Sequence, residues 1–175
     1  MRERTVLEKI SYYINKVVGI ICIIMGMTMT VTTLVGILFR YVMTNPLPWT
    51  EELARYTMIW MGLLAISMGV RSGLHLGVQL VIKKFPLIVR RIITYMTRIT
   101  IGYFLYMLTI YGYKMAMNGL KQTAPALQVS MTYVLIAIPV ATALALIQLL
   151  LITGIDIQNK LTGRDNTNIP EGRKI

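Results

Sequence analysis

Residues 17–39, VVGIICIIMGMTMTVTTLVGILF, decide the fold class of this chain because they form a run of 23 residues without a charged side chain. A helix rises 1.5 Å per residue, so about 20 apolar residues cross the ~30 Å hydrocarbon core of a bilayer. A secretory signal peptide has a shorter apolar core that ends in small residues, whereas this run ends in Phe39, Arg40 and Tyr41. The sequence therefore predicts a retained transmembrane helix.

The composition of the whole chain agrees with a membrane protein. Of its 175 residues, 55% are apolar and 14% are charged, against about 25% charged residues in soluble domains. The 18 Lys and Arg residues outnumber the 7 Asp and Glu residues. Most of these basic residues lie between apolar segments, whereas a nucleic-acid-binding protein typically carries them on one face of a polar domain. We predict a small polytopic membrane protein that binds no nucleic acid.

Three further apolar segments are long enough to span a bilayer. They cover residues 53–70, 92–113 and 129–155. Arg55 and Arg98 lie near enough to the ends of their segments for the guanidinium groups to reach the interface, and Pro139 more often kinks than breaks a membrane helix. We predict an all-α membrane protein with four transmembrane helices in a single domain over residues 1–160.

The distribution of Lys and Arg predicts the orientation of these helices. Thirteen of the 18 lie before the first span, between the second and third spans, or after the fourth. The two alternate connections hold Arg40, Lys114 and Lys121. Short cytoplasmic connections carry the excess of basic residues, so both termini are predicted to be cytoplasmic.

Two amphipathic segments are predicted to lie on the inner membrane surface. Residues 7–17 repeat apolar side chains at helical spacing opposite polar ones, and residues 74–89 place apolar residues around two lysines ahead of a proline. Such segments suit an interfacial helix. The polar tail, residues 161–175, is predicted to be disordered.

The sequence offers little for chemistry. A single cysteine, Cys22, and a single histidine, His75, argue against disulfides, zinc sites and paired haem ligands. The seven acidic residues lie outside the spans or at their very ends, so the membrane core has no carboxylate that could carry a proton. We predict no enzyme activity, no cofactor, and no catalytic, substrate-binding or metal-binding residues.

The densest polar cluster, residues 45–56, lies where the second span begins. Its prolines suit the first turn of a helix, its glutamates suit the positive helix terminus, and Glu51 and Arg55 have the spacing of an i,i+4 ion pair. This pattern fits a capped helix start, or a site at which a partner docks. The docking candidates are Arg40, Trp49, Glu51, Glu52, Arg55 and Tyr56.

Small residues form two stripes at helical spacing. The candidates for helix packing are Ala65 and Gly69 in the second span, and Ala137, Ala141 and Ala145 in the fourth. Small side chains let helix backbones approach closely in lipid. The stripes could serve packing among the four helices or contact with a partner.

Four short motifs resemble a known family. They read FRYV at residues 39–42, LPWTEELARY at 47–56, MGVR at 68–71 and GLHL at 73–76. Over the region from Phe39 to Val81, the chain resembles the small membrane subunit, DctQ-like, of tripartite ATP-independent periplasmic (TRAP) transporters. The other two thirds are similar to that family in length, four-helix layout and topology.

The resemblance implies a non-catalytic subunit bound to a large membrane subunit, which carries substrate and sodium in an elevator-type movement. A periplasmic binding protein delivers the solute, and the small subunit enlarges the static scaffold and helps that protein dock. We therefore expect a small permease subunit in a bacterial inner membrane, surrounded by lipids, that serves the sodium-coupled uptake of organic acids of the C4-dicarboxylate or sialic-acid type. Sodium is expected on the large subunit.

An alternative is a self-sufficient small transporter or channel formed by oligomerisation. Such a protein needs a polar stripe along one span. The threonines of the first span come nearest to one: Thr28, Thr30, Thr32 and Thr33. Hydroxyl groups in membrane helices, however, usually bond to backbone or to a neighbouring helix.

Overall fold

The computed structural model describes residues 6–72 and 87–161, and within these ranges the predicted all-α fold is confirmed. The four long helices are α1 (Val6–Tyr41), α2 (Pro48–Ser72), α4 (Leu87–Asn118) and α6 (Ala137–Leu161). A short 3-10 helix, η1 (Gly119–Lys121), and one helical turn, α5 (Thr132–Leu135), flank the loop that joins α4 to α6. Most of the predicted second surface helix, residues 74–86, and residues 162–175 of the predicted tail lie outside the described residues.

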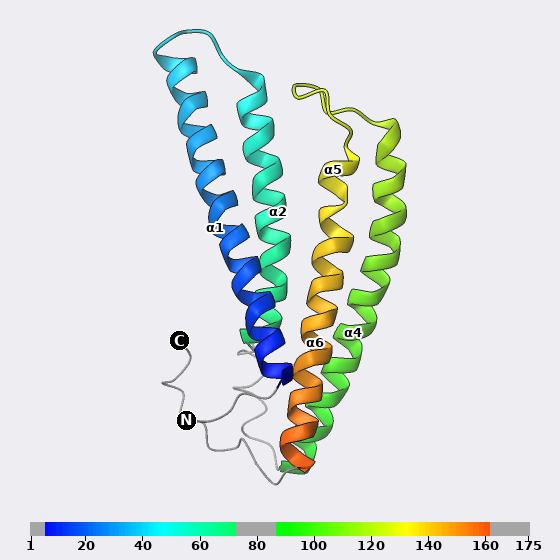
Figure 1. Ribbon diagram of the computed structural model, residues 1–175. Coiled ribbons are helices and arrows are strands. Elements are labelled where there is room, and N and C mark those ends of the chain that lie inside the picture. The colour runs from blue at the N-terminus through cyan, green and yellow to red at the C-terminus, as the bar shows by residue number, and fades with distance from the viewer. Residues whose placement is uncertain (1–5, 73–86, 162–175) are drawn as a thin grey trace.

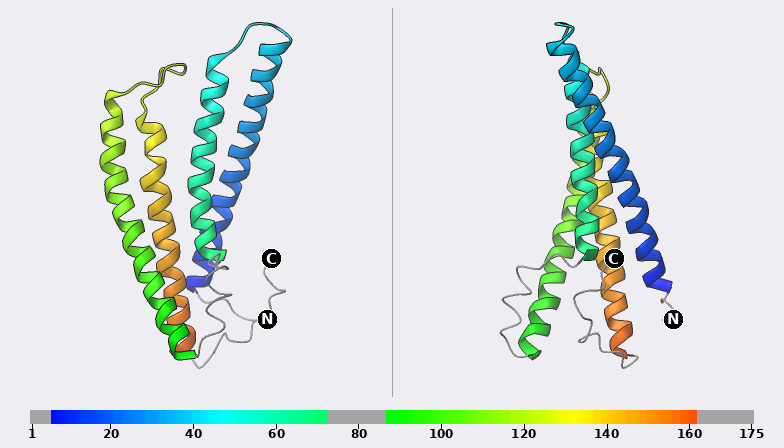
Figure 2. Two further views of the ribbon diagram at one scale, coloured as in Figure 1. Left: turned by 180° about the vertical axis from the view of Figure 1, so that it is seen from behind. Right: turned by 90° about the vertical axis from the view of Figure 1, so that its left-hand side faces the viewer.

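The four long helices lie side by side in the order α1, α2, α6 and α4 (Figures 1 and 2). We call this layer of four helices the slab. α2 packs against α1 and α6, α4 packs against α6, and α1 also contacts α6. The two connections, residues 42–47 and 122–131, lie at one end of this slab, which we call the loop end. The start of α1 and the end of α6 lie at the opposite end, which we call the terminal end. α2 and α6 are therefore central, and α1 and α4 form the two edges.

α1 is one continuous helix of 36 residues. The prediction of a separate surface helix over residues 7–17, followed by a span, is therefore wrong. No proline interrupts these residues, and at 1.5 Å per residue the helix is about 54 Å long, well beyond the hydrocarbon core. A buried contact holds its first turns to α6: Ser11 Oγ donates to Gln148 Oε1 at 2.7 Å, and Gln148 Nε2 donates to the Ser11 carbonyl at 3.2 Å.

Three stretches of helix among the described residues are long and apolar enough to cross a membrane. They are Val6–Tyr41, Pro48–Val70 and Thr132–Gln158. The predicted span at residues 92–113 lies within α4, which has the length of a span but a lower hydropathy. The five tyrosines of α4, together with its threonines, Arg98 and Lys114, contribute to that lower value. Residues 87–89 of the predicted second surface helix form the first turn of α4.

The core of the slab lies along α6. One cluster joins Val18 of α1 and Leu64 of α2 to Ala141, and a second joins Leu105 of α4 to Ala145 and Leu149. All three alanines of the predicted α6 stripe, the third being Ala137, have 0% exposure. This stripe is therefore enclosed by the helices of the chain itself. In α2, by contrast, Ala65 is exposed and Gly69 is half-buried, so Ala65 takes no part in packing among the described helices.

The approach of α1 to α2 near the loop end depends on Gly36. A Cβ atom at Gly36 would lie 2.7 Å from Thr50 Oγ1, and this buried hydroxyl is held by its own hydrogen bond to the Leu47 carbonyl at 2.7 Å. We expect Gly36→Ala to lower the stability of the purified chain by about 1–3 kcal/mol, as overpacking does. The measurement is the midpoint of thermal unfolding in detergent.

The matched control is Gly62→Ala in α2, because a Cβ atom at Gly62 meets no heavy atom within 4 Å. Alanine favours a helix over glycine by about 0.8–1 kcal/mol, so the control is expected to raise the unfolding midpoint or leave it unchanged. Thr50→Ala removes the crowded hydroxyl, so it should restore part of the stability lost in Gly36→Ala. Equal midpoints for both glycine variants would contradict the close approach at Gly36.

Candidate functional site

The candidate docking cluster lies at the start of α2. Pro48 is the first residue of the helix, as predicted, and the proline ring suits this position because its missing N–H needs no partner there. Thr50 closes the first turn: its hydroxyl and its N–H both donate to the Leu47 carbonyl. The next two residues point to different surroundings, since Glu51 is exposed and Glu52 is buried.

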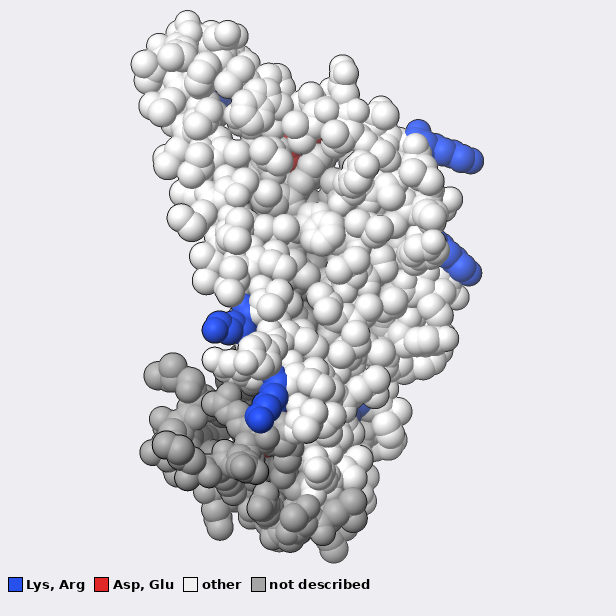
Figure 3. Space-filling model, viewed as in Figure 1, with Lys and Arg blue, Asp and Glu red and all other residues white. Residues whose placement is uncertain are grey.

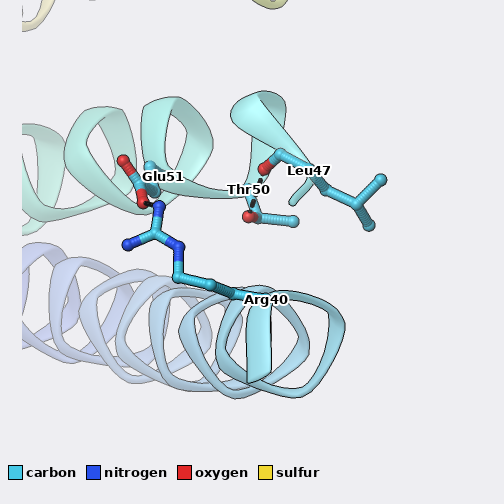
Figure 4. A network of polar contacts seen from close by, with 4 residues as sticks. All are labelled: Arg40, Leu47, Thr50 and Glu51. Atoms are coloured by element: carbon cyan, nitrogen blue, oxygen red, sulfur yellow. Dashed lines mark hydrogen bonds and ion pairs between the residues drawn. The ribbon is translucent and has the colours of Figure 1, made fainter. Parts of the chain in front are cut away.

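Glu51 forms an ion pair with Arg40, the penultimate residue of α1 (Figure 4). The predicted i,i+4 pair with Arg55 is therefore wrong, because the packing of α1 against α2 brings a second cation to this carboxylate. The side chains of Arg40 and Glu51 are 52% and 56% exposed, and exposed ion pairs contribute only about 0–1 kcal/mol to stability. The pair therefore remains a polar surface feature of the loop end.

Glu52 has a different role, because its carboxylate bonds within the chain. Its Oε1 accepts a hydrogen bond from the Tyr56 hydroxyl at 2.5 Å. Its Oε2 accepts the backbone N–H groups of Ala126 at 2.8 Å and of Leu127 at 2.7 Å. Hydrogen bonds to an ionised acceptor are stronger than those between neutral groups. Glu52 therefore anchors the connection between α4 and α6 to the start of α2.

That connection, residues 122–131, is itself a small ordered hairpin. Thr123 and Ser130 form an isolated antiparallel bridge, and the Ala124 N–H donates to the Val129 carbonyl at 2.8 Å. α2 also holds the residues that follow, because Trp60 Nε1 donates to the Tyr133 carbonyl at 3.0 Å. α2 thus holds the hairpin through Glu52 and the helical turn α5, which follows the hairpin, through Trp60.

Sequence reasoning missed the residues that complete these attachments. Trp60 carries a signal that could have been used, since a tryptophan N–H within a protein usually finds an acceptor. Ala126 and Leu127 carry no such signal, because they bind Glu52 through backbone groups that every non-proline residue has.

The remaining docking candidates are exposed to different degrees. Tyr56 is half-buried and bonded to Glu52. Trp49 is 39% exposed. Arg55 is exposed and makes no hydrogen bond or ion pair with the described residues. The groups at the loop end that remain available to a partner are therefore Arg55, Trp49 and the Arg40–Glu51 pair.

A second ion pair lies nearer the terminal end. Arg98 of α4, predicted to reach the interface, is paired with Asp156 of α6, and their side chains are 21% and 37% exposed. Elsewhere on the face shown in Figure 3, separate Lys and Arg side chains stand on a largely uncharged surface. Within residues 6–72 and 87–161, no three His, Cys, Asp or Glu side chains come together as a metal site would require.

Comparison with known proteins places these features in a family. The chain matches the family described as tripartite ATP-independent periplasmic transporters, DctQ component, over residues 29–154. It is also similar to a Haemophilus influenzae protein that carries the name TRAP transporter small permease protein, with 25% identity over 91 residues. That similarity covers 52% of this chain and 56% of the curated relative, so just over half of each is aligned. The resemblance indicated by the motifs is confirmed, and the chain belongs to the DctQ family of TRAP transporter components.

Proposed function

We propose that the chain is the small permease subunit of a sodium-coupled TRAP transporter in a bacterial inner membrane, with both termini in the cytoplasm. It scaffolds the large transport subunit and helps the periplasmic binding protein dock, for uptake of organic acids of the C4-dicarboxylate or sialic-acid type. Sodium binds the large subunit. The observation that carries this proposal is the family match, which extends from the last third of α1 to the last third of α6.

The polar contacts inside the slab support a scaffold role. Gln148 is fully buried and bonded to Ser11, and Thr109 and Thr142 lie 3.0 Å apart between α4 and α6. The hydrogen bonds of these side chains connect one helix to another. In membranes, such hydrogen bonds between helices stabilise a fixed arrangement, which is the property that a static scaffold needs.

The threonines of α1 disfavour the alternative of a self-sufficient transporter or channel. Their hydroxyl groups donate to carbonyl groups of the same helix three or four residues earlier. Hydroxyl groups that are already bonded to their own backbone offer few free donors to a solute path. An oligomer built on this stripe would lack the polar lining that a channel requires.

For docking, we propose that the loop end faces the periplasm and meets the binding protein. Arg55 and the Arg40–Glu51 pair offer charged groups there, and Trp49 offers an amphipathic ring. The anchored hairpin at residues 122–131 keeps the neighbouring surface in one shape. A preformed surface binds with a smaller entropic cost than one that must be ordered.

Reconstitution tests the proposed function. Liposomes that contain the large subunit and this chain, with the binding protein outside, are expected to take up labelled organic acid under a sodium gradient. Liposomes that lack this chain are expected to take up little. Liposomes with this chain alone should take up none under a sodium or a proton gradient, because the chain has no carboxylate deep in a span to hold either ion. Uptake by this chain alone would establish the alternative.

The orientation is tested by cysteine labelling. Cys22→Ser removes the native thiol, and single cysteines then replace Asn45, Asn118 or Gln158. In intact cells with a permeable outer membrane, an impermeant maleimide is expected to label positions 45 and 118 and to spare position 158. Labelling of position 158 at the rate of the other two would reverse the proposed orientation.

A further inference from the structure

The two edge helices of the slab present different surfaces. Along α4, four of the exposed residues recur at helical spacing on one face, which we call the tyrosine face. It consists of Ile99, Tyr103, Tyr106 and Tyr113, which are 67%, 63%, 53% and 53% exposed. The side of α4 that contacts α6 adjoins this face: Leu105 is buried there and Gly102 lies against Leu149.

The hydroxyl groups of the tyrosine face have no partner within the described part of the chain. Tyr103 and Tyr106 make no hydrogen bond with a described residue. Tyr106 lies eight residues from both Arg98 and Lys114, so about 12 Å of helix separates it from each charged residue. In the predicted four-span layout it therefore lies near the middle of the α4 span, whereas tyrosines usually gather at the membrane interfaces.

A tyrosine hydroxyl at this depth is costly in lipid. Hydrocarbon offers no hydrogen-bond acceptor, and an unpaired hydroxyl there loses the bonds that it makes in water. Threonine avoids this cost by bonding to its own helix, as Thr100 does with the Met96 carbonyl. Tyrosine has no equivalent route, because its rigid ring carries the hydroxyl away from the backbone.

The outward face of α1 shows none of these features. Its exposed residues between the two ends are apolar apart from Thr30 and Thr33: Ile20, Ile21, Ile23, Ile24, Met27, Val31, Leu34, Ile37 and Leu38. These two threonines donate to carbonyl groups of α1 itself. In addition, α1 reaches the hydropathy of a membrane span and α4 does not. α1 is suited to lipid, and α4 requires a protein neighbour.

We propose that the tyrosine face of α4 packs against a transmembrane helix of the large subunit, which supplies hydrogen-bond acceptors to Tyr103 and Tyr106, while the outward face of α1 contacts lipid. This inference rests on the proposed function for the identity of the partner. It adds which edge of the slab carries the interface and which chemistry the partner presents there. The acceptors that a membrane helix can present are Ser, Thr, Asn, Gln or Glu oxygens and the backbone carbonyl groups freed at a kink.

Photo-crosslinking in the assembled complex tests the location. The photoreactive residue p-benzoylphenylalanine replaces Tyr106 in one variant and Ile23, an exposed residue of α1, in the other. After irradiation of membranes that contain both subunits, the Tyr106 variant is expected to form a covalent product with the large subunit, and the Ile23 variant is not. A product from position 23 alone, or a product from position 106 that joins two copies of this chain, would overturn the inference.

Removing the hydroxyl groups tests the chemistry. Tyr103→Phe and Tyr106→Phe keep the rings, so the fold should be preserved, and each is expected to lower the apparent association constant with the large subunit by about threefold. Tyr111→Phe is the matched control, because Tyr111 is exposed on another side of α4 and its ring still contacts Lys114. Equal association for all three variants would overturn the assignment of acceptors.

The two proposals fail in different ways. If the unmodified chain does not co-purify with the large subunit, the proposed function fails, and this inference fails with it. If the two co-purify but the crosslinks come from α1, the proposed function stands and the assignment of the α4 edge is wrong.

Discussion

Glu52→Ala is expected to release the hairpin at residues 122–131 from α2. The change removes the acceptor of three hydrogen bonds, those from the Tyr56 hydroxyl and from the N–H groups of Ala126 and Leu127. Trypsin cleaves after Lys121, an exposed residue beside the hairpin. We expect cleavage at this site in detergent-solubilised protein to accelerate by about tenfold or more, because hydrogen bonds to a charged acceptor are among the stronger ones.

Glu51→Ala is the matched control, since it removes the neighbouring carboxylate, which pairs with an exposed arginine. This variant is expected to leave cleavage after Lys121 within about twofold of the unmodified chain, as the small effect of exposed pairs implies. In the full transporter, Glu52→Ala should also lose most uptake, because the surface proposed for docking loses its shape. Cleavage at the same rate in both variants would show that Glu52 does not anchor the hairpin.

The start of α2 shows what one sequence can and cannot predict about the site. The prolines and the Thr-Glu-Glu segment predicted a helix start, and the helix does begin at Pro48. The use of Glu52 was beyond prediction, since its partners are backbone N–H groups 74 and 75 residues further along the chain. Every non-proline residue has a backbone N–H, so residue type does not indicate which of these groups bonds to a carboxylate. The sequence therefore grouped Glu51 and Glu52 as equivalent candidates, although one is exposed and the other is buried.

For α1, too, the sequence predicted one part of the structure and missed another. Its apolar run predicted a membrane helix, and its amphipathic first turns predicted a helix as well. The error was to place a boundary between the amphipathic stretch and the apolar stretch. The two can form one continuous helix when no proline lies between them. The contact that fixes those first turns, between Ser11 and Gln148, joins residues 137 positions apart. Gln148 offered a signal, since an amide within an apolar span usually bonds to a neighbouring helix.

The small-residue stripe of α6 was predicted without knowledge of which helices it meets. Periodicity of 3.6 residues places Ala137, Ala141 and Ala145 on one face, but it does not identify what that face contacts. In the structure the stripe meets α1 and α2 at one level and α4 at another. A neighbour on each side explains why all three alanines have 0% exposure.

Ala141→Trp is expected to have the largest effect of any change to this stripe. Ala141 is fully buried in a cluster with Val18 and Leu64, which come from two other helices. Extra methylene groups in a packed core cost about 1–3 kcal/mol, and an indole ring adds far more volume than that. We expect the variant to be recovered from membranes in much lower yield and to lose its association with the large subunit.

The control requires a position on α6 that does not touch the core. Leu144 lies off the stripe but is packed against the same cluster as Ala141, so Leu144→Trp is expected to be destabilising as well. Leu150 is 64% exposed, and Leu150→Trp should be recovered in normal yield because its ring can extend from the slab. If Ala141→Trp and Leu150→Trp are recovered equally well and have the same unfolding midpoint in detergent, α6 cannot be the enclosed helix of the slab, since a ring of that size has no space between α1, α2 and α6 at Ala141.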